Sequence, residues 1–162
     1  MKIELDQKLP ITEFFYLDKD SNVKKIKSSD LFDRKKIIII GVPGAFTKVC
    51  SAIHLPGYIE KYSDLEKKGI TKIVCISVND PNVMKAWGEH LKVKDKIFMA
   101  ADPFCQFTKA IGADVDKSAR GLGIRSERYS MYVENGIVKK IKVEEDTGIC
   151  EISAAENFLK EI

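Results

Sequence analysis

The chain has 162 residues, of which 44% are hydrophobic and 31% are charged. This size and composition are typical of a chain that folds around one buried core, and they exclude a disordered or low-complexity protein. The net charge is only +3, with basic and acidic residues mixed along the sequence, so nothing favours nucleic-acid binding. We therefore expect a single domain spanning residues 1–162 and no nucleic-acid partner.

The N-terminal segment and the cysteines bear on location. The first ten residues mix acidic and basic side chains without the apolar segment of a signal peptide, and the longest apolar run is 37–43. We expect a cytoplasmic protein without a membrane span. Four cysteines, at positions 50, 75, 105 and 150, have neither zinc-site spacing nor a Cys-x-x-Cys pair. In that compartment they should be free thiols, and we expect no metal site.

The predicted elements begin with a short hairpin. Residues 13–17 and 23–26 flank the turn-forming segment 18–22, and a brief helix follows from about Ser29. Residues 36–42 contain four consecutive isoleucines. Such a run without polar alternation is typical of a strand that is buried on both faces.

A helical pattern follows this strand over about 47–68. Pro56 and Gly57 interrupt the pattern, and we expect them to kink or split the helix, because proline lacks the amide hydrogen and its ring clashes with the preceding turn. Gly69 is a suitable cap for the helix C-terminus.

The second half of the chain continues the alternation of strands and helices. The expected strands are 72–78, 97–100, 128–133 and 137–143, the last two joined by a turn at 134–136, and the expected helices are 81–91, 104–111 and 153–162. Alternating elements with a late hairpin predict an α/β protein with a central mixed sheet and helices on both faces. A thioredoxin-like fold fits this order.

The clearest chemical signal lies where the isoleucine-rich strand meets the next helix. This segment reads Pro43-Gly44-Ala45-Phe46-Thr47-Lys48-Val49-Cys50. A cysteine in the first turn of a helix faces free backbone amides and the positive end of the helix dipole, which favour the thiolate over the thiol. The Thr47 hydroxyl can turn toward the sulfur, and Pro43 can shield it from water. Cys50 is therefore our candidate nucleophile.

Pro43, Thr47 and Cys50 resemble the Pro-x-x-x-Thr-x-x-Cys signature of the peroxiredoxins, and Pro-Gly-Ala-Phe-Thr is similar to the type II, or peroxiredoxin-five, subgroup. The sequence departs from that subgroup at Lys48, where proline is frequent, and at the variable Val49. We expect Lys48 to tune the pocket entrance or the docking of a reductant. The resemblance continues over nearly the whole chain, through His54-Leu55-Pro56-Gly57, Ser77-Val78-Asn79-Asp80-Pro81, Val83-Met84-Lys85-Ala86-Trp87, Gly121-Leu122-Gly123 and Arg125-Ser126-Glu127-Arg128-Tyr129-Ser130.

This resemblance implies a thiol-dependent peroxidase of antioxidant defence that needs no cofactor. The Cys50 thiolate would attack the terminal oxygen of hydrogen peroxide or an organic hydroperoxide, leaving a sulfenic acid. The family's distant arginine corresponds to Arg128, with Arg125 as the nearest competitor. The guanidinium of Arg128, a rigid fork of donors, can stabilise the thiolate and bind a peroxide oxygen.

Three further residues are expected at the substrate pocket. The resemblance implies that Gly44 lines the turn, where backbone amides bind the peroxide oxygen, and we expect Phe46 to form a pocket wall. His54 lies one helical turn after Cys50. We expect it to pack or to donate hydrogen bonds, because a thiolate stabilised by a dipole and an arginine needs no general base.

The thiol that resolves the sulfenic acid is left open by the sequence. Cys150 lies in a loop close to the resolving cysteine of animal relatives, although slightly offset from it. Cys75 lies in a predicted buried strand, at a position where plant type II enzymes also have a cysteine. The third possibility is a one-cysteine cycle, in which glutaredoxin with glutathione, or thioredoxin, reduces Cys50. We expect only a packing role for Cys105.

Other readings of the same residues remain. Cys50 could serve a peroxide-responsive redox sensor or holdase, which would react once instead of turning over. A disulfide oxidoreductase is disfavoured because Thr47 and Ile53 occupy the positions where its second cysteine would stand, and a non-catalytic binding module is the remaining possibility. The resemblance also implies a homodimer formed by the face around the active-site loops, which would cover Phe46 and Trp87.

Overall fold

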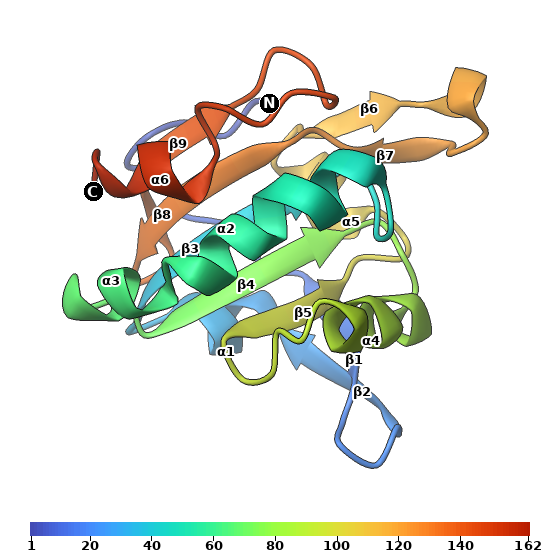
Figure 1. Cartoon of the computed structure of the whole chain (residues 1–162), viewed down its shortest axis with the longest axis horizontal. Helices are drawn as coiled ribbons and strands as arrows, with labels where there is room; N and C mark the ends of the chain where they lie inside the picture. Colours follow the sequence, from blue (N-terminus) through green and yellow to red (C-terminus); the bar gives the residue numbers. More distant parts are fainter.

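The structure is a computed structural model that describes residues 1–162. Its main sheet has seven strands in the order β2-β1-β5-β4-β3-β8-β9 (Figure 1). These strands are β1 (Glu13–Leu17), β2 (Val23–Lys27), β3 (Lys36–Val42), β4 (Lys72–Ser77), β5 (Ile97–Ala101), β8 (Tyr129–Glu134) and β9 (Ile137–Val143). The three central strands β3, β4 and β5 are parallel, and the outer pairings are antiparallel. The predicted mixed sheet is confirmed.

The isoleucine-rich strand β3 explains why the sheet is covered on both sides. Side chains alternate between the faces of a strand, so Ile38 and Ile40 enter one buried cluster while Ile37 and Ile39 enter the other. All four isoleucines have no exposed surface. Each face therefore needs its own layer of helices.

Two groups of helices supply these layers (Figure 1). The helical segments are α1 (Ser28–Phe32), the π-helical turn η1 (Cys50–His54), α2 (Leu55–Glu60), α3 (Tyr62–Lys67), α4 (Pro81–His90), α5 (Gln106–Ala110), the 3-10 turn η2 (Ser118–Arg120) and α6 (Ala155–Leu159). The cluster that contains Ile38 also receives side chains from η1, α2, α3, α4 and α6, whereas α1 and α5 pack on the opposite face. None of these helices is long and apolar enough to cross a bilayer.

The helical stretch after β3 divides at a different place than expected. Its first turn widens into η1, where the Leu55 amide donates to the carbonyl of Cys50, and it then breaks at Lys61 between α2 and α3. The helical backbone continues through Pro56, and the π-helical turn η1 lies directly before it, so the expected disturbance is a widened turn and not a split. Gly69 caps α3 as predicted, with φ of +85° and its amide donating to the Glu66 carbonyl.

The sequence did not predict a second, two-stranded sheet made of β6 (Asp114–Asp116) and β7 (Ile124–Ser126). Together with η2, these strands form an arm that projects from the main sheet (Figure 1). The two C-terminal helices are also shorter than expected. The first begins only at Gln106 because Cys105 has left-handed backbone angles, and the second covers Ala155–Leu159 instead of 153–162.

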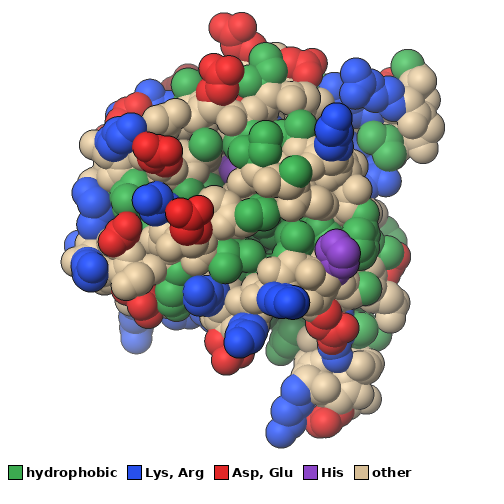
Figure 2. Space-filling view, in the orientation of Figure 1, with side chains coloured by type: hydrophobic (Ala, Val, Ile, Leu, Met, Phe, Trp, Pro, Cys, Tyr) green, Lys and Arg blue, Asp and Glu red, His purple; other side chains and the backbone are tan.

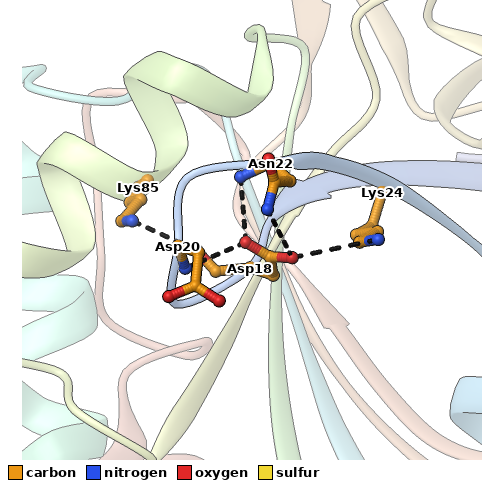
Figure 3. A network of polar contacts seen from close by, with 5 residues as sticks. All are labelled: Asp18, Asp20, Asn22, Lys24 and Lys85. Carbon is orange, nitrogen blue, oxygen red and sulfur yellow. Dashed lines mark hydrogen bonds and ion pairs between the residues drawn. The ribbon is translucent and has the colours of Figure 1, made fainter.

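The turn between β1 and β2 is held by one carboxylate. Asp18 accepts hydrogen bonds from the backbone amides of Asp20 and Asn22, each at 2.9 Å, and pairs with Lys24 at 3.9 Å (Figure 3). Lys85 of α4 donates to the Asp18 carbonyl at 3.1 Å. The hydrogen bonds from Asn22 and Asp20 and the charge of Lys24 lower the pKa of Asp18, and the Lys85 bond ties the hairpin to α4. Strand β2, largely exposed, forms one edge of the main sheet.

One backbone contact places the end of β3 beside the start of β8. The two strands are antiparallel, with Gly41 opposite Tyr129. A Cβ atom at Gly41 would lie 1.9 Å from Cε1 of Tyr129, so only glycine allows this approach. The turn that follows β3 is consequently brought next to Arg128, which immediately precedes β8.

Candidate active site

Cys50 lies in the first helical turn after β3 and is fully buried. The turn begins at Thr47, whose carbonyl accepts from the Ser51 amide at 3.0 Å. Thr47 Oγ1 lies 2.9 Å from Cys50 Sγ and also 2.9 Å from the Gly44 carbonyl. Because a hydroxyl has one hydrogen, it donates to only one of these acceptors at a time. Ionisation of the sulfur would favour the bond to Sγ.

Arg128 brings a positive charge to the same sulfur. Its Nη2 lies 3.3 Å from Cys50 Sγ, and its Nε and Nη2 also donate to the Thr147 carbonyl at 3.0 and 2.7 Å. Arg128 is 1% exposed and belongs to none of the ion pairs in the structure. A buried cation is costly unless an anion lies beside it. The arrangement therefore suits a negatively charged Cys50.

His54 lies behind the guanidinium and is fully buried. Burial and the charge of Arg128 lower the pKa of His54 to about 3, so its ring is neutral near pH 7. Nδ1 lies 3.2 Å from Arg128 Nη1 and must accept, which leaves the ring hydrogen on Nε2. That hydrogen faces the Ser153 carbonyl at 3.2 Å. His54 thus orients Arg128 and makes no hydrogen bond to Cys50.

A buried polar network holds the loop that carries the hydrogen-bond acceptor of Arg128. Ser130 Oγ donates to the Ser153 carbonyl at 2.7 Å and receives the Tyr58 hydroxyl at 2.8 Å. The Glu144 carboxylate accepts from the Ser153 amide and hydroxyl at 2.8 and 2.7 Å, and from the Glu151 amide at 2.7 Å. The network fixes the loop that follows β9. Since the carbonyl of Thr147 belongs to that loop, the network also positions Arg128.

An open hollow of about 130 Å³ leads to this group. Pro43, Thr47 and Arg128 line it, and the sulfur of Cys50 lies within hydrogen-bond distance of the last two. The other lining residues are Lys48, Val49, Lys117, Arg120, Leu122, Thr147 and Gly148. The structure thus brings together the four residues predicted as catalytic. It adds a wall from the β6–β7 arm that the sequence had not indicated.

Three residues expected in the pocket do not line this hollow. Phe46, at φ of +59°, turns away and packs against His90 and Trp87, with ring centroids 5.7 and 6.5 Å apart. Phe46 therefore forms no wall of this hollow, and His54 lies behind Arg128 in the hydrogen-bonding role expected for it. Gly44 provides the carbonyl near Thr47 but does not line the hollow either.

The alternative arginine is excluded by its contacts. Arg125 Nε donates to the Leu122 carbonyl at 2.7 Å, and its Nη1 would lie 3.2 Å from a Cβ atom at Gly44. Arg125 therefore packs along the arm and the turn after β3. Only Arg128 donates a hydrogen bond to the sulfur of Cys50.

The remaining cysteines are free thiols in less reactive surroundings. Cys75 is fully buried in β4, and burial raises its pKa well above the usual value, with the charge of Cys50 adding to the effect. Burial also raises the pKa of Cys150, although Arg128 opposes it, and its Sγ lies 4.0 Å from Ser153 Oγ. Cys105 is buried too, and burial raises its pKa. No group of three or more His, Cys, Asp or Glu side chains could share a metal ion.

Comparison with known proteins gives a consistent result. The Redoxin family model matches residues 5–159. The chain is 41% identical over 161 residues to peroxiredoxin-2E, chloroplastic, of Arabidopsis thaliana, covering 98% of this chain and 68% of the relative. The structure of reduced Prx3 from Vibrio vulnificus in complex with H2O2 has a TM-score of 0.92 and 41% identity, with 98% of both chains covered. The 1-Cys peroxiredoxin of Plasmodium falciparum, termed an antioxidant protein, has a TM-score of 0.89 and 31% identity, covering 99% of this chain and 100% of that one.

The fold, the site and these similarities define a redoxin, and the chain belongs to the type II peroxiredoxins of that family. It is accordingly an enzyme, a thiol-dependent peroxidase. The predicted thioredoxin-like fold, family and activity are confirmed.

Proposed function

We propose that Cys50 is the cysteine that attacks hydroperoxides, with Arg128, Thr47 and Pro43 completing the catalytic site. The observation that carries this proposal is the buried guanidinium of Arg128, which has no carboxylate partner and lies 3.3 Å from Cys50 Sγ. No other cysteine of the chain accepts a hydrogen bond from an arginine side chain.

In the proposed step, a lone pair of the Cys50 thiolate forms a bond to the terminal oxygen of the hydroperoxide. The O–O bond breaks, and its electron pair goes to the leaving oxygen, which takes up a proton and departs as water or an alcohol. The sulfur is oxidised to a sulfenic acid. Arg128 and Thr47 donate hydrogen bonds where negative charge moves from sulfur to oxygen, and Pro43 limits the access of water to the hollow.

Replacement of single cysteines tests this assignment. Cys50→Ser should abolish the consumption of hydrogen peroxide in the presence of a thiol reductant, because a serine hydroxyl is not ionised near pH 7. Cys105→Ser is the matched control, since Cys105 is also buried but lies apart from the hollow. Retained peroxide consumption in Cys50→Ser would refute the role of Cys50.

For the return step we propose a one-cysteine cycle, in which an external thiol reduces the sulfenic acid. Cys75 is held within a central strand, and burial raises the pKa of both Cys75 and Cys150, which makes them poor nucleophiles near pH 7. The resemblance to a 1-Cys peroxiredoxin supports the same choice. The external thiol would be glutathione with glutaredoxin, or thioredoxin.

Mass analysis under non-reducing conditions tests the cycle. After one equivalent of hydrogen peroxide, the monomer should carry one added oxygen on Cys50. An intrachain bridge to Cys150 or Cys75 would contradict the one-cysteine cycle. Turnover with a thiol separates an enzyme from a redox sensor or holdase, which would consume a single equivalent of peroxide and stop.

We also propose that two copies associate through the face beside the active site. Ile53 and Ile152 are 52% and 43% exposed, and they adjoin the contacting pair His54 and Ser153. Figure 2 shows hydrophobic side chains gathered over this part of the surface. Trp87 was expected on this face but does not belong to it. It is fully buried within the chain and donates to Ser51 Oγ at 2.9 Å.

Sedimentation velocity tests this association. The wild type should sediment as a dimer, and Ile53→Asp should sediment as a monomer because it places a charge in the apolar face. Val23→Asp, on the opposite hairpin, is the control. The predicted cytoplasmic location stays a prediction, since the similar curated proteins include chloroplastic and mitochondrial forms.

A further inference from the structure

The mouth of the hollow carries more positive charge than the proposed catalysis uses. Besides Arg128, its lining includes Lys48, Lys117 and Arg120, and it includes no aspartate or glutamate. We call these three side chains the basic rim. Lys48 and Arg120 are exposed and Lys117 is partly exposed.

None of the three rim side chains has an intramolecular acidic partner. They belong to none of the ion pairs in the structure and make no side-chain hydrogen bond. The neighbouring acids are already engaged with backbone amides. Asp116 accepts from the Ser118 amide at 2.8 Å, and Asp146 accepts from the Gly148 amide at 2.6 Å. Because no carboxylate lies within ion-pair distance of these three side chains, they are available to a ligand.

The rim is built from two remote parts of the chain. Lys48 precedes Cys50 by two residues, whereas Lys117 and Arg120 come from the arm formed by β6, η2 and β7. Figure 2 shows Lys and Arg side chains gathered on this projecting arm. Leu122 of the arm also lines the hollow, so the arm forms part of its entrance.

We infer that the basic rim binds the carboxylates of a small anionic thiol, and so selects the reductant that regenerates Cys50. This inference rests on the proposed one-cysteine cycle. Hydrogen peroxide is neutral and gains no attraction from the rim. A thiol with carboxylates gains it directly, and the same cations favour ionisation of the incoming thiol.

The basic rim acts on the two-step thiol exchange that reduces the Cys50 sulfenic acid. The incoming thiolate attacks the sulfur of the Cys50 sulfenic acid, the S–O bond breaks, and the oxygen leaves as water after taking up a proton. A second molecule of the same thiol then attacks the mixed disulfide. It releases the oxidised thiol as its own disulfide and returns Cys50 as the thiolate. Both attacking thiols pass the rim, so its charge affects both steps.

Three thiols of different charge test the inference. Wild-type protein, oxidised with one equivalent of hydrogen peroxide, is mixed with mercaptosuccinate, 2-mercaptoethanol or cysteamine, which are anionic, neutral and cationic. Rates are divided by the thiolate fraction of each thiol. Mercaptosuccinate should react about tenfold faster than 2-mercaptoethanol, and cysteamine more slowly than either. Added salt should bring the three rates together, because ions screen exposed charges.

A triple variant isolates the rim. In Lys48→Gln/Lys117→Gln/Arg120→Gln the preference for mercaptosuccinate should disappear. The matched control is Lys19→Gln/Lys92→Gln/Lys94→Gln, which removes the same charge around a separate cleft of about 650 Å³ between α4 and the β1–β2 hairpin. The control should keep the preference.

The outcomes separate this inference from the proposed function. If wild-type Cys50 is not oxidised by peroxide, the proposed function fails. If it is oxidised but the rates ignore thiol charge and salt, only the inference fails. An equal loss of preference in the rim variant and in the control would also overturn it, because the effect would then come from net charge alone.

Discussion

His54 and Arg128 share a hydrogen bond in which Arg128 Nη1 donates to His54 Nδ1 at 3.2 Å, because a guanidinium has no acceptor. Protonation of His54 would place two positive charges against each other in the interior. Burial of the ring, together with the neighbouring charge of Arg128, therefore lowers the pKa of His54 to about 3.

This histidine should make the protein less stable in acid. The pKa of His54 is 6.5 in the unfolded chain and about 3 in the folded one, so between these values only the unfolded chain takes up the proton. The contribution of the neutral, buried His54 to the free energy of unfolding is therefore complete above pH 6.5, and it is lost as the pH falls toward 3. We expect the free energy of unfolding to fall by roughly 1.4 kcal/mol per pH unit in this range from His54. Urea denaturation at several pH values measures it. His54→Gln should flatten the dependence, and an unchanged slope would contradict the assignment.

Arg128 should affect the peroxide step strongly. Arg128→Gln removes the charge beside Cys50 Sγ, and we expect kcat/KM for hydrogen peroxide to fall about 100-fold to 1000-fold, as when an oxyanion donor is lost. Arg128→Lys keeps the charge but cannot bond the sulfur, Thr147 and His54 together, so it should recover only part of the rate. Stopped-flow oxidation of Cys50 provides the measurement. Full activity in Arg128→Gln would remove the arginine from the mechanism.

Thr47 should act through its hydroxyl. Thr47→Val keeps the shape but loses the donor 2.9 Å from Cys50 Sγ, and a hydrogen bond to a charged group contributes about 1.5–3 kcal/mol. We expect a fall of roughly 10-fold to 100-fold in the rate of Cys50 oxidation. Thr47→Ser retains the hydroxyl and is the matched control. Equal rates for the valine and serine variants would show that only the volume of the side chain matters.

Glu144 should stabilise the loop that holds Arg128. Glu144→Ala leaves two backbone amides and the Ser153 hydroxyl without their acceptor, and we expect the free energy of unfolding to fall by about 1–3 kcal/mol. The peroxide rate should fall as well, because the Thr147 carbonyl loses its fixed place. Glu145→Ala, at an exposed neighbour, should change neither quantity. Identical denaturation curves for both variants would rule out this role.

Two glycines should respond oppositely to alanine. Gly41→Ala brings a Cβ to 1.9 Å from the Tyr129 ring, and such overpacking costs about 1–3 kcal/mol or more. Gly57→Ala meets only the Cβ of Ala155 at 3.7 Å, within α2, and should raise stability by up to about 1 kcal/mol. Thermal unfolding compares them. A stable Gly41→Ala protein would mean that β3 and β8 can separate without cost.

The elements that the sequence predicted well are those with a strong local pattern. The isoleucines of β3 are buried on both faces, and the turn at Asn135 and Gly136 has the positive φ angles that its residues favour. The β6–β7 arm covers little of the core, so its sequence has no regular apolar pattern from which its two strands could be predicted. The expected split at Pro56 is absent, because the effect of a proline depends on its place within the helix.

The site was predictable only where a motif carries its geometry. Cys50 and Thr47 are near in sequence, and Arg128 was found through the family resemblance alone. The partners of His54 could not be predicted, because Ser130 and Ser153 reach it from β8 and from the loop before α6. The basic rim depends in the same way on an arm whose position only the fold determines.

The two edges of the main sheet have a consequence for how copies meet. Strand β2 is five residues long and exposes Lys24, Lys25 and Lys27, while β9 carries Lys139, Lys140 and Lys142. An incoming strand would have to desolvate these ammonium groups before its backbone could pair with β2 or with the part of β9 that residues 6–9 leave unpaired. Growth of the sheet from one molecule into the next is thereby opposed at both ends, which protects a protein with such an apolar central strand from aggregating.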